Sequence, residues 1–217
     1  MRYFTIGSTD NLEVIGHYPQ MKSMLTYNPD GENSFRKVRW NEFADFVPQY
    51  KVEIHPEANV TNFLERSPLP FGFLIDEHFL EVLKSHKLPD YRAYKVEIFH
   101  NNKSLEYYWF HFVFDMWHYL EKDLSRVIVY QKISGKTLTE HSFVSRDNLA
   151  SLKKSLNFEK GMQIKEVVFD ESAAEFDLLA ITDFFHIPLI SQRLKDNLHL
   201  AGLNGFETQE YGRIKFL

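Results

Sequence analysis

Acidic side chains dominate one stretch of the chain and have the clearest potential for chemistry. Residues 166–192 include no lysine or arginine. The carboxylates of this acidic segment are Glu166, Asp170, Glu171, Glu175, Asp177 and Asp183. Three interpretations stay open: a solvated loop and helix start that the helix dipole favours, a divalent-metal cluster of oxygen ligands, or an acidic face that docks onto a basic partner. The third makes these carboxylates candidate partner-binding residues.

Histidine and serine patterns point to no recognised catalytic or metal centre. The ten histidines fit neither the H-E-x-x-H helix nor a zinc-finger spacing. The chain has no cysteine, which excludes disulfides, thiolate zinc sites, iron–sulfur ligation and cysteine nucleophiles. It also lacks the G-x-S-x-G elbow of serine hydrolases. We therefore predict no catalytic residue, no cofactor-binding residue and no metal ligand.

One sequence imitates a phosphate-binding loop. Ser134-Gly135-Lys136-Thr137 resembles the end of a P-loop, but Tyr130 occupies the place of the first glycine. The residues that follow look extended, whereas a P-loop is followed by a helix. We interpret this segment as a hairpin turn between strands at residues 126–131 and 137–144.

The remaining elements are predicted from periodicity and caps. Strands are expected at residues 94–99 and 105–114, and the second, which is nearly all aromatic, should be central and covered on both faces. A short strand at residues 71–75 precedes Asp76 as the N-cap of a helix that extends to residue 87. Ser145 should cap another helix, and a strand follows at residues 164–169. Near the end of the chain, Ser191 caps a helix that stops at Gly202, and a short strand begins at Phe206.

Two of these units are related by a constant separation of 115 positions. The matching pairs are Ile75/Ile190, Asp76/Ser191, Phe79/Leu194, Leu83/Leu198, Leu88/Leu203 and Tyr91/Phe206. The pattern predicts two similar strand-cap-helix halves, although such a unit can also recur by physics alone. We expect a single domain over residues 1–217, with possible sub-lobes at 1–90 and 91–217.

Composition predicts a globular α+β protein with a mixed, mostly antiparallel sheet and a few packed helices. Of the 217 residues, 44% are hydrophobic, and the formal net charge is −5. This charge argues against nucleic acid as a partner. The most membrane-like stretch, residues 107–120, is too short to span a bilayer and contains Asp115, so we expect no membrane association. The first residues lack the apolar core of a secretory signal, which favours a cytoplasmic location.

The C-terminal part resembles a known protein family. The residues that carry the resemblance are VVFDE at 167–171, DLL at 177–179, PLISQRLKDNL at 188–198 and AGLNGFE at 201–207. They are similar to a bacterial immunity-protein family of polymorphic toxin systems, formerly a domain of unknown function, whose members end in an S-E-R-L-K-like helix followed by A-G-L-x-G-F. Residues 72–89 and 107–111 extend the similarity more weakly. Gln192 replaces the family's usual glutamate, which removes a capping-box partner.

The resemblance implies a protein that neutralises its cognate toxin by tight stoichiometric binding and is not an enzyme. It implies no cofactor, and the acidic segment would steer association with a basic toxin domain. Two alternatives remain open. One is a metal-dependent hydrolase or nuclease that uses the acidic segment at residues 170–183 with a histidine. The other is a non-catalytic scaffold or assembly subunit with exposed aromatic residues.

Overall fold

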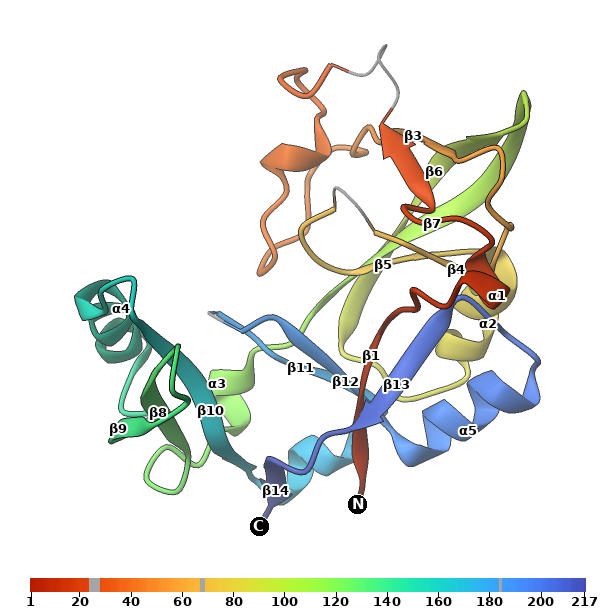
Figure 1. Cartoon of the computed structure of the whole chain (residues 1–217). Helices are drawn as coiled ribbons and strands as arrows, with labels where there is room; N and C mark the ends of the chain where they lie inside the picture. Colours follow the sequence, from red (N-terminus) through yellow and green to blue (C-terminus); the bar gives the residue numbers. More distant parts are fainter. Residues whose placement is uncertain (24–27, 67–68, 184) are drawn as a thin grey trace.

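The computed structural model describes residues 1–23, 28–66, 69–183 and 185–217, and it has the predicted α+β architecture. Three sheets, two of four strands and one of six, are packed with short helices (Figure 1). Neighbouring strands are antiparallel except for β3 beside β6 and β10 beside β14. In the part of the chain that is described, no helix is long and apolar enough to cross a membrane.

The six-stranded sheet is built around a long hairpin. Its strands in spatial order are β2 (Met21–Ser23), β3 (Lys51–Ile54), β6 (Asp90–His100), β7 (Lys103–Val113), β5 (Phe73–Ile75) and β4 (Phe63–Leu64). Asn101 and Asn102 form the tip of the β6–β7 hairpin with positive φ values of 50° and 63°, which asparagine tolerates in tight hairpin turns. The central position of β7 confirms the prediction from its aromatic sequence. Trp109 and Phe110, which face opposite sides of the sheet, are both fully buried.

The second sheet joins the two ends of the chain. Its strands in spatial order are β11 (Leu178–Ile181), β12 (Ile187–Ser191), β1 (Tyr3–Ser8) and β13 (Phe206–Glu210). The third sheet has the order β14 (Ile214–Phe216), β10 (Lys160–Phe169), β8 (Arg126–Gln131) and β9 (Thr137–Ser142). The turn predicted in place of a P-loop is confirmed between β8 and β9. The strand β14 was not predicted.

The helices and 3-10 turns begin at side-chain caps, three of which the sequence predicts. They are α1 (Leu12–Ile15), η1 (Phe35–Lys37), α2 (Glu77–Lys84), α3 (Met116–Tyr119), α4 (Arg146–Ser155), η2 (Glu171–Glu175) and α5 (Gln192–Leu200). Asp76, Ser145 and Ser191 cap α2, α4 and α5 as predicted. The expectation that α2 extends to residue 87 is wrong. The helix ends at Lys84, where the Ser85 hydroxyl donates to the carbonyl of Val82 at 2.7 Å and closes the last turn.

The separation of 115 residues corresponds to a repeated topology. In the first repeat, β5, α2 and β6 follow one another, and β7 lies between the two strands, antiparallel to both. In the second repeat, β12, α5 and β13 follow one another, and β1 lies between those strands, antiparallel to both. A fourth strand, β4 or β11, pairs with the outer edge of β5 or β12.

The strand registers of the repeats also agree. Ile75 pairs with Tyr108 and Phe63, and its counterpart Ile190 pairs with Phe4 and Leu178. Tyr91 pairs with Phe112, as Phe206 pairs with Ser8. Thus β4, β5 and β6 match β11, β12 and β13 at the separation of 115, while β1 matches β7 at a separation of 104. The repeated unit therefore includes five elements and not only the predicted strand, cap and helix.

The same hydrogen bonds recur inside each repeat. The Asp76 amide donates to the carbonyl of Asn62 at 2.9 Å, and the Ser191 amide donates to the carbonyl of Asp177 at 2.8 Å. The Tyr107 hydroxyl donates to the carbonyl of Thr61 at 2.6 Å. Its counterpart, the Tyr3 hydroxyl, donates to the carbonyl of Phe176 at 2.6 Å. These matches extend the repetition from topology to individual side chains.

The two repeats share one core. Their facing side chains form a continuous buried cluster that includes Phe79 and Leu83 from α2 with Leu194 and Leu198 from α5. Reciprocal backbone contacts link the repeats, since the amide of Phe63 donates to the carbonyl of Asn204 and the amide of Asp177 donates to the carbonyl of Lys87. The possible boundary at residues 90 and 91 falls at the start of β6, and the second repeat takes its middle strand from the N-terminus. The repeats are therefore not contiguous lobes.

Candidate functional site

One member of the acidic segment, Asp177, is a buried structural charge. Its side chain has no exposed surface. It accepts hydrogen bonds from the Ser191 hydroxyl at 2.6 Å, from the Lys87 amide at 3.0 Å and from two nitrogens of Arg193 at 3.0 and 2.6 Å. Burial by itself would raise the pKa of Asp177, but these hydrogen bonds outweigh it, and the pKa lies below its ordinary value. Asp177 thus connects β11, α5 and the loop after α2, and no partner can reach it.

Three more of these carboxylates are engaged with basic side chains. Glu166 pairs with Lys215, and Glu175 pairs with Lys87. The Asp183 side chain is 7% exposed and accepts from Arg146 at 3.1 Å. It also accepts from the indole nitrogen of Trp117. Lysines and arginines distant in sequence therefore neutralise a segment that contains none of its own.

Only a small acidic surface remains around η2. Asp170 is the N-cap of this turn and accepts from the amides of Ser172 and Ala173. Glu171 and Glu175 are exposed at its two ends. The predicted partner-binding residues therefore do not form one continuous face. Among the described residues, no three of these carboxylates bring metal-ligand atoms together; the group that does so is His17, His55 and Glu57.

A pocket with an aromatic wall lies where the first two sheets meet. Its aromatic lining consists of Trp40, Phe71, Phe112 and Phe114. Its polar lining consists of Arg66, Thr182 and His186. The residues come from the loops before β5 and after η1, from β7 and from the hairpin between β11 and β12. We call this the Arg66 pocket.

Arg66 brings a positive charge that the described part of the chain leaves without an ion-pair partner. Its side chain follows β4, and no carboxylate of the described residues lies within salt-bridge distance of it. The residue is exposed, yet the surrounding protein buries its guanidinium enough to lower its pKa. An arginine without a counter-ion among the described residues can take an anionic ligand through charge-assisted hydrogen bonds.

Two further polar groups line the same pocket. Thr182 is 6% exposed, and its hydroxyl has no hydrogen-bond partner among the described residues. The His186 ring contacts the indole of Trp40 edge-on, with centroids 5.7 Å apart. Burial lowers the pKa of His186; Asp183 raises it, and the positive charge of Arg66 lowers it further. The imidazole is therefore mainly neutral at neutral pH and can accept or donate a hydrogen bond.

The pocket wall is held from behind by His111. This fully buried imidazole donates from Nε2 to the carbonyl of Trp40 at 3.1 Å. Its ring packs against Phe71 with centroids 4.7 Å apart. Burial lowers the pKa of His111, which keeps the ring neutral. The aromatic side of the Arg66 pocket is consequently preorganised.

The pocket continues along the sheet into a second hollow. Arg66, Gly72 and Pro188 line both, and the second hollow also includes Gly7 and Ser8 of β1. Gly72 has a φ of 75°, and a Cβ there would collide with the carbonyl of Phe110. Only glycine therefore allows the segment before β5 to approach β7 this closely. Arg66 therefore lines two neighbouring hollows.

Sequence reasoning did not find Arg66, Thr182 or His186. Arg66 is distant in sequence from Thr182 and His186, and the three belong to no motif, so only the packing of the two sheets brings the arginine to the other two. No family model matches the chain, and no curated protein matches it. The family resemblance of the C-terminal residues therefore stays a prediction. The structure gives those residues local roles: Ser191 is a cap, Gly202 has a positive φ of 69°, and Gly205, with a φ of 87°, packs against Phe63 and Thr61.

Proposed function

We propose that this chain is an immunity protein that neutralises a cognate bacterial toxin in the cytoplasm by tight, stoichiometric binding. The observation that carries the proposal is the Arg66 pocket, a preorganised aromatic site with an arginine that has no ion-pair partner in the described part of the chain. Arginine and large aromatic residues are the side chains that dominate the binding energy of protein interfaces. The resemblance of residues 167–207 to immunity proteins supplies the class of partner.

The lining of the two hollows indicates what they accept. Because Arg66 lines both hollows beside aromatic and apolar residues, we infer that the occupant is an extended segment of the toxin with a carboxylate flanked by apolar side chains. The carboxylate would form charge-assisted, paired hydrogen bonds with the guanidinium. The Thr182 hydroxyl, which has no hydrogen-bond partner among the residues that the structure describes, would gain one in the complex. Apolar neighbours would cover Phe71 and Phe112 and exclude water from the ion pair.

The test is to purify the chain with the product of the neighbouring gene and to measure the complex by isothermal titration calorimetry. We expect a one-to-one complex and loss of toxin activity at equimolar ratio. The substitution Arg66→Gln should weaken binding by about 30-fold or more, the loss typical of a residue that dominates an interface. Arg39→Gln is the matched control, because Arg39 is an exposed arginine whose nearest carboxylate is Glu42 on the same loop.

Each outcome discriminates between interpretations. Failure of the two gene products to form any complex would contradict the immunity role. A tight complex that Arg66→Gln leaves unchanged would retain the role and move the contact surface. The next surface to test is then the acidic one around η2, where Glu171→Lys should slow association with a basic toxin and flatten its dependence on salt.

The two other functions make different predictions. A metal-dependent hydrolase or nuclease would require Mg²⁺ or Mn²⁺ and would lose activity on Asp170→Ala. A scaffold subunit would assemble with increasing concentration in the absence of any partner. The first is disfavoured by the separation of the carboxylates, because Asp177 is buried with Arg193 while Glu175 pairs with Lys87.

A further inference from the structure

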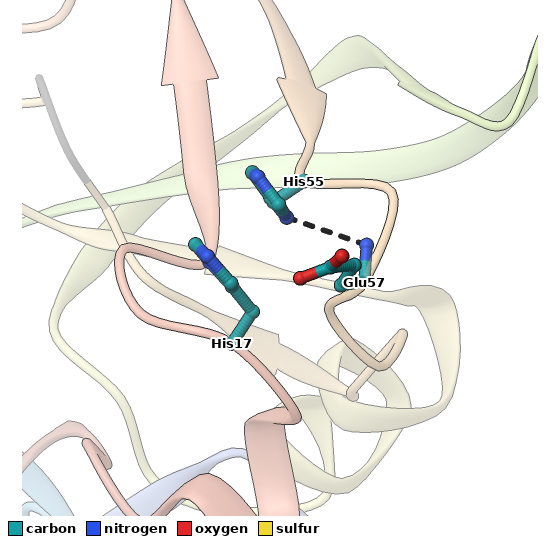
Figure 2. Close-up of side chains that lie close together, drawn as sticks. All are labelled: His17, His55 and Glu57. Carbon is teal, nitrogen blue, oxygen red and sulfur yellow. Dashed lines mark hydrogen bonds between the residues drawn. The ribbon is translucent and has the colours of Figure 1, made fainter.

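Two histidines and a glutamate come together away from the Arg66 pocket. His17 follows α1, and His55 and Glu57 follow β3. Their potential ligand atoms all lie within 4.8 Å of one another. Figure 2 shows the two imidazole rings facing each other, with the Glu57 carboxylate beside them. We propose that these three side chains bind one divalent transition-metal ion of the zinc class.

The backbone holds the two contributing loops side by side. The amide of His55 donates to the carbonyl of Gln20, and the amide of Asn59 donates to the carbonyl of Ile15, both at 2.8 Å. Gly16 lies between them with a φ of 74°, and a Cβ there would lie 2.9 Å from the carbonyl oxygen of Glu57. Hydrogen bonds on both sides of the three side chains therefore fix their Cα positions before any ion binds.

Hydrogen bonds also orient the His17 ring for coordination. Its Nδ1 lies 3.1 Å from the carbonyl oxygen of Pro19, which can only accept, so Nδ1 carries the proton. The Nε2 lone pair is then free to bind a metal. A ligating histidine that donates its other N–H to a backbone carbonyl is the usual arrangement in metal sites, because the bond fixes the tautomer and the direction of the ring.

The Nδ1 lone pair of His55 faces the backbone amide of Glu57. Its Nδ1 accepts from the Glu57 amide at a long distance of 3.3 Å (Figure 2). This weak bond is the one that coordination through Nδ1 would replace. Glu57 is exposed, and His17 and His55 are half-exposed. Solvent water can therefore complete the coordination shell.

Binding requires a local rearrangement that side-chain rotation can supply. The two rings are now stacked, with centroids 3.5 Å apart and planes 5° from parallel. Ligand atoms about 2.0–2.1 Å from a tetrahedral zinc ion are about 3.3 Å from one another, so one ring must turn and the carboxylate must approach. Two imidazoles and one carboxylate suit zinc, cobalt, nickel or copper, whereas magnesium and calcium favour oxygen ligands alone. The ion would join the loop before β2 to the loop after β3.

The experiment uses the full chain, freed of metal by a chelator. Zn²⁺ is titrated by calorimetry, and Co²⁺ is titrated by visible absorption, which reports the coordination geometry. We expect saturation at one ion per chain and a Zn²⁺-dependent rise in melting temperature. His55→Ala and Glu57→Gln should each weaken binding by about 10-fold or more, the scale of even supporting-residue losses in metal sites. His78→Ala is the matched control, because His78 is an exposed histidine on α2.

The outcomes are distinct from those of the proposed function. The metal site is overturned by one-to-one binding that persists in both variants, or by the absence of saturable Zn²⁺ binding to the full chain. Melting curves without metal show whether each variant is folded, and the Zn²⁺-dependent shift is read from folded protein only. Toxin binding by the chelated protein is measured separately, so failure of the metal site leaves the immunity role intact.

Discussion

The two repeats place the same pair of side chains in contact but put the negative charge on opposite members. In the first, the side-chain nitrogen Nδ2 of Asn62 donates to the carboxylate of the cap residue Asp76 at 2.7 Å. In the second, the hydroxyl of the cap residue Ser191 donates to the carboxylate of Asp177 at 2.6 Å. The fold therefore requires a polar bridge between the strand start and the helix cap, and either residue can supply the charge.

The position of the charge decides what else must surround it. Asp76 is half-buried at the N-terminus of α2, where the helix dipole and the Phe79 amide stabilise a carboxylate. Asp177 lies beyond the cap of its helix and is fully buried. It pairs with Arg193, whose counterpart in the first repeat is the exposed His78. In the second repeat the charged member of the bridge is the strand-start residue and not the helix cap, and this buried carboxylate is paired with an arginine.

The largest expected difference between the repeats is the loss of stability when each strand-start side chain is removed. Asp177→Ala should lower the free energy of unfolding by about 3–5 kcal/mol, because the substitution leaves the donors of Ser191 and Lys87 without their buried acceptor. Asn62→Ala, at a half-buried position, should cost about 1–2 kcal/mol. Urea denaturation of both variants measures the comparison. Equal losses would show that the charge at Asp177 contributes nothing beyond the bridge.

A second test uses pH. The folded-state pKa of Asp177 is lowered, so its carboxylate contributes stability above its unfolded pKa of about 3.9, and this contribution is lost as the pH falls through the folded-state value. Asp177→Asn should cost about 1–3 kcal/mol at pH 7. The gap to the wild type should narrow below about pH 4. Asp123→Asn, at an exposed position, controls for the change in net charge. A gap that is constant down to pH 2 would contradict the lowered pKa.

The matched tyrosines test how closely the repeats are equivalent. Burial, and then the nearby charge of Asp177, raises the pKa of Tyr3; burial and Asp76 do the same for Tyr107. Each hydroxyl donates to one main-chain carbonyl, so Tyr3→Phe and Tyr107→Phe should each cost about 1–2 kcal/mol. Thermal unfolding of the two variants should give losses that agree within about 0.5 kcal/mol. A clear inequality would mean that only one of the two bonds contributes to stability.

The smallest expected effect comes from making the second repeat resemble the first at the helix surface. Arg193→His places the residue type of His78 beside Asp177. Because the Arg193 side chain is 60% exposed, its loss should cost about 1 kcal/mol or less at pH 7. Urea denaturation checks this value. A loss as large as that of Asp177→Ala would instead make the arginine the main support of the buried carboxylate.

Local features of the fold could be predicted wherever a few adjacent residues determine the backbone. The caps Asp76, Ser145 and Ser191 mark their helices because each side-chain oxygen binds an amide two or three residues later. The aromatic sequence of β7 indicated a buried central strand for the same local reason. The separation of 115 residues indicated the repeat, but it missed β4 and β11. The two-residue strand β4 has no periodicity, and the middle strand β1 comes from the far end of the chain.

The candidate site could not be predicted, because charge and burial depend on distant partners. From the sequence, the acidic segment indicates an anionic face, yet Lys87, Arg146 and Lys215 reach it from other elements. The reverse holds at Arg66, which belongs to no sequence motif. In the folded chain it lies beside aromatic residues, and no carboxylate of the described ranges pairs with it. His17 and His55 likewise match no spacing pattern, since a strand pairing brings them together.

The α+β class, the caps, the hairpins and the recurrence of one strand-helix unit could be predicted from the amino-acid sequence, because these features depend on contacts between residues close along the chain. Three features became visible only in the folded chain. Asp177 is buried, most carboxylates of the acidic segment form ion pairs, and Arg66 lines a pocket. Electrostatic energy depends on separation in space and on exclusion of water, and neither is a property of sequence distance. The candidate partner-binding residues therefore depend on tertiary packing, whereas the residues that shape the backbone can be predicted from the sequence.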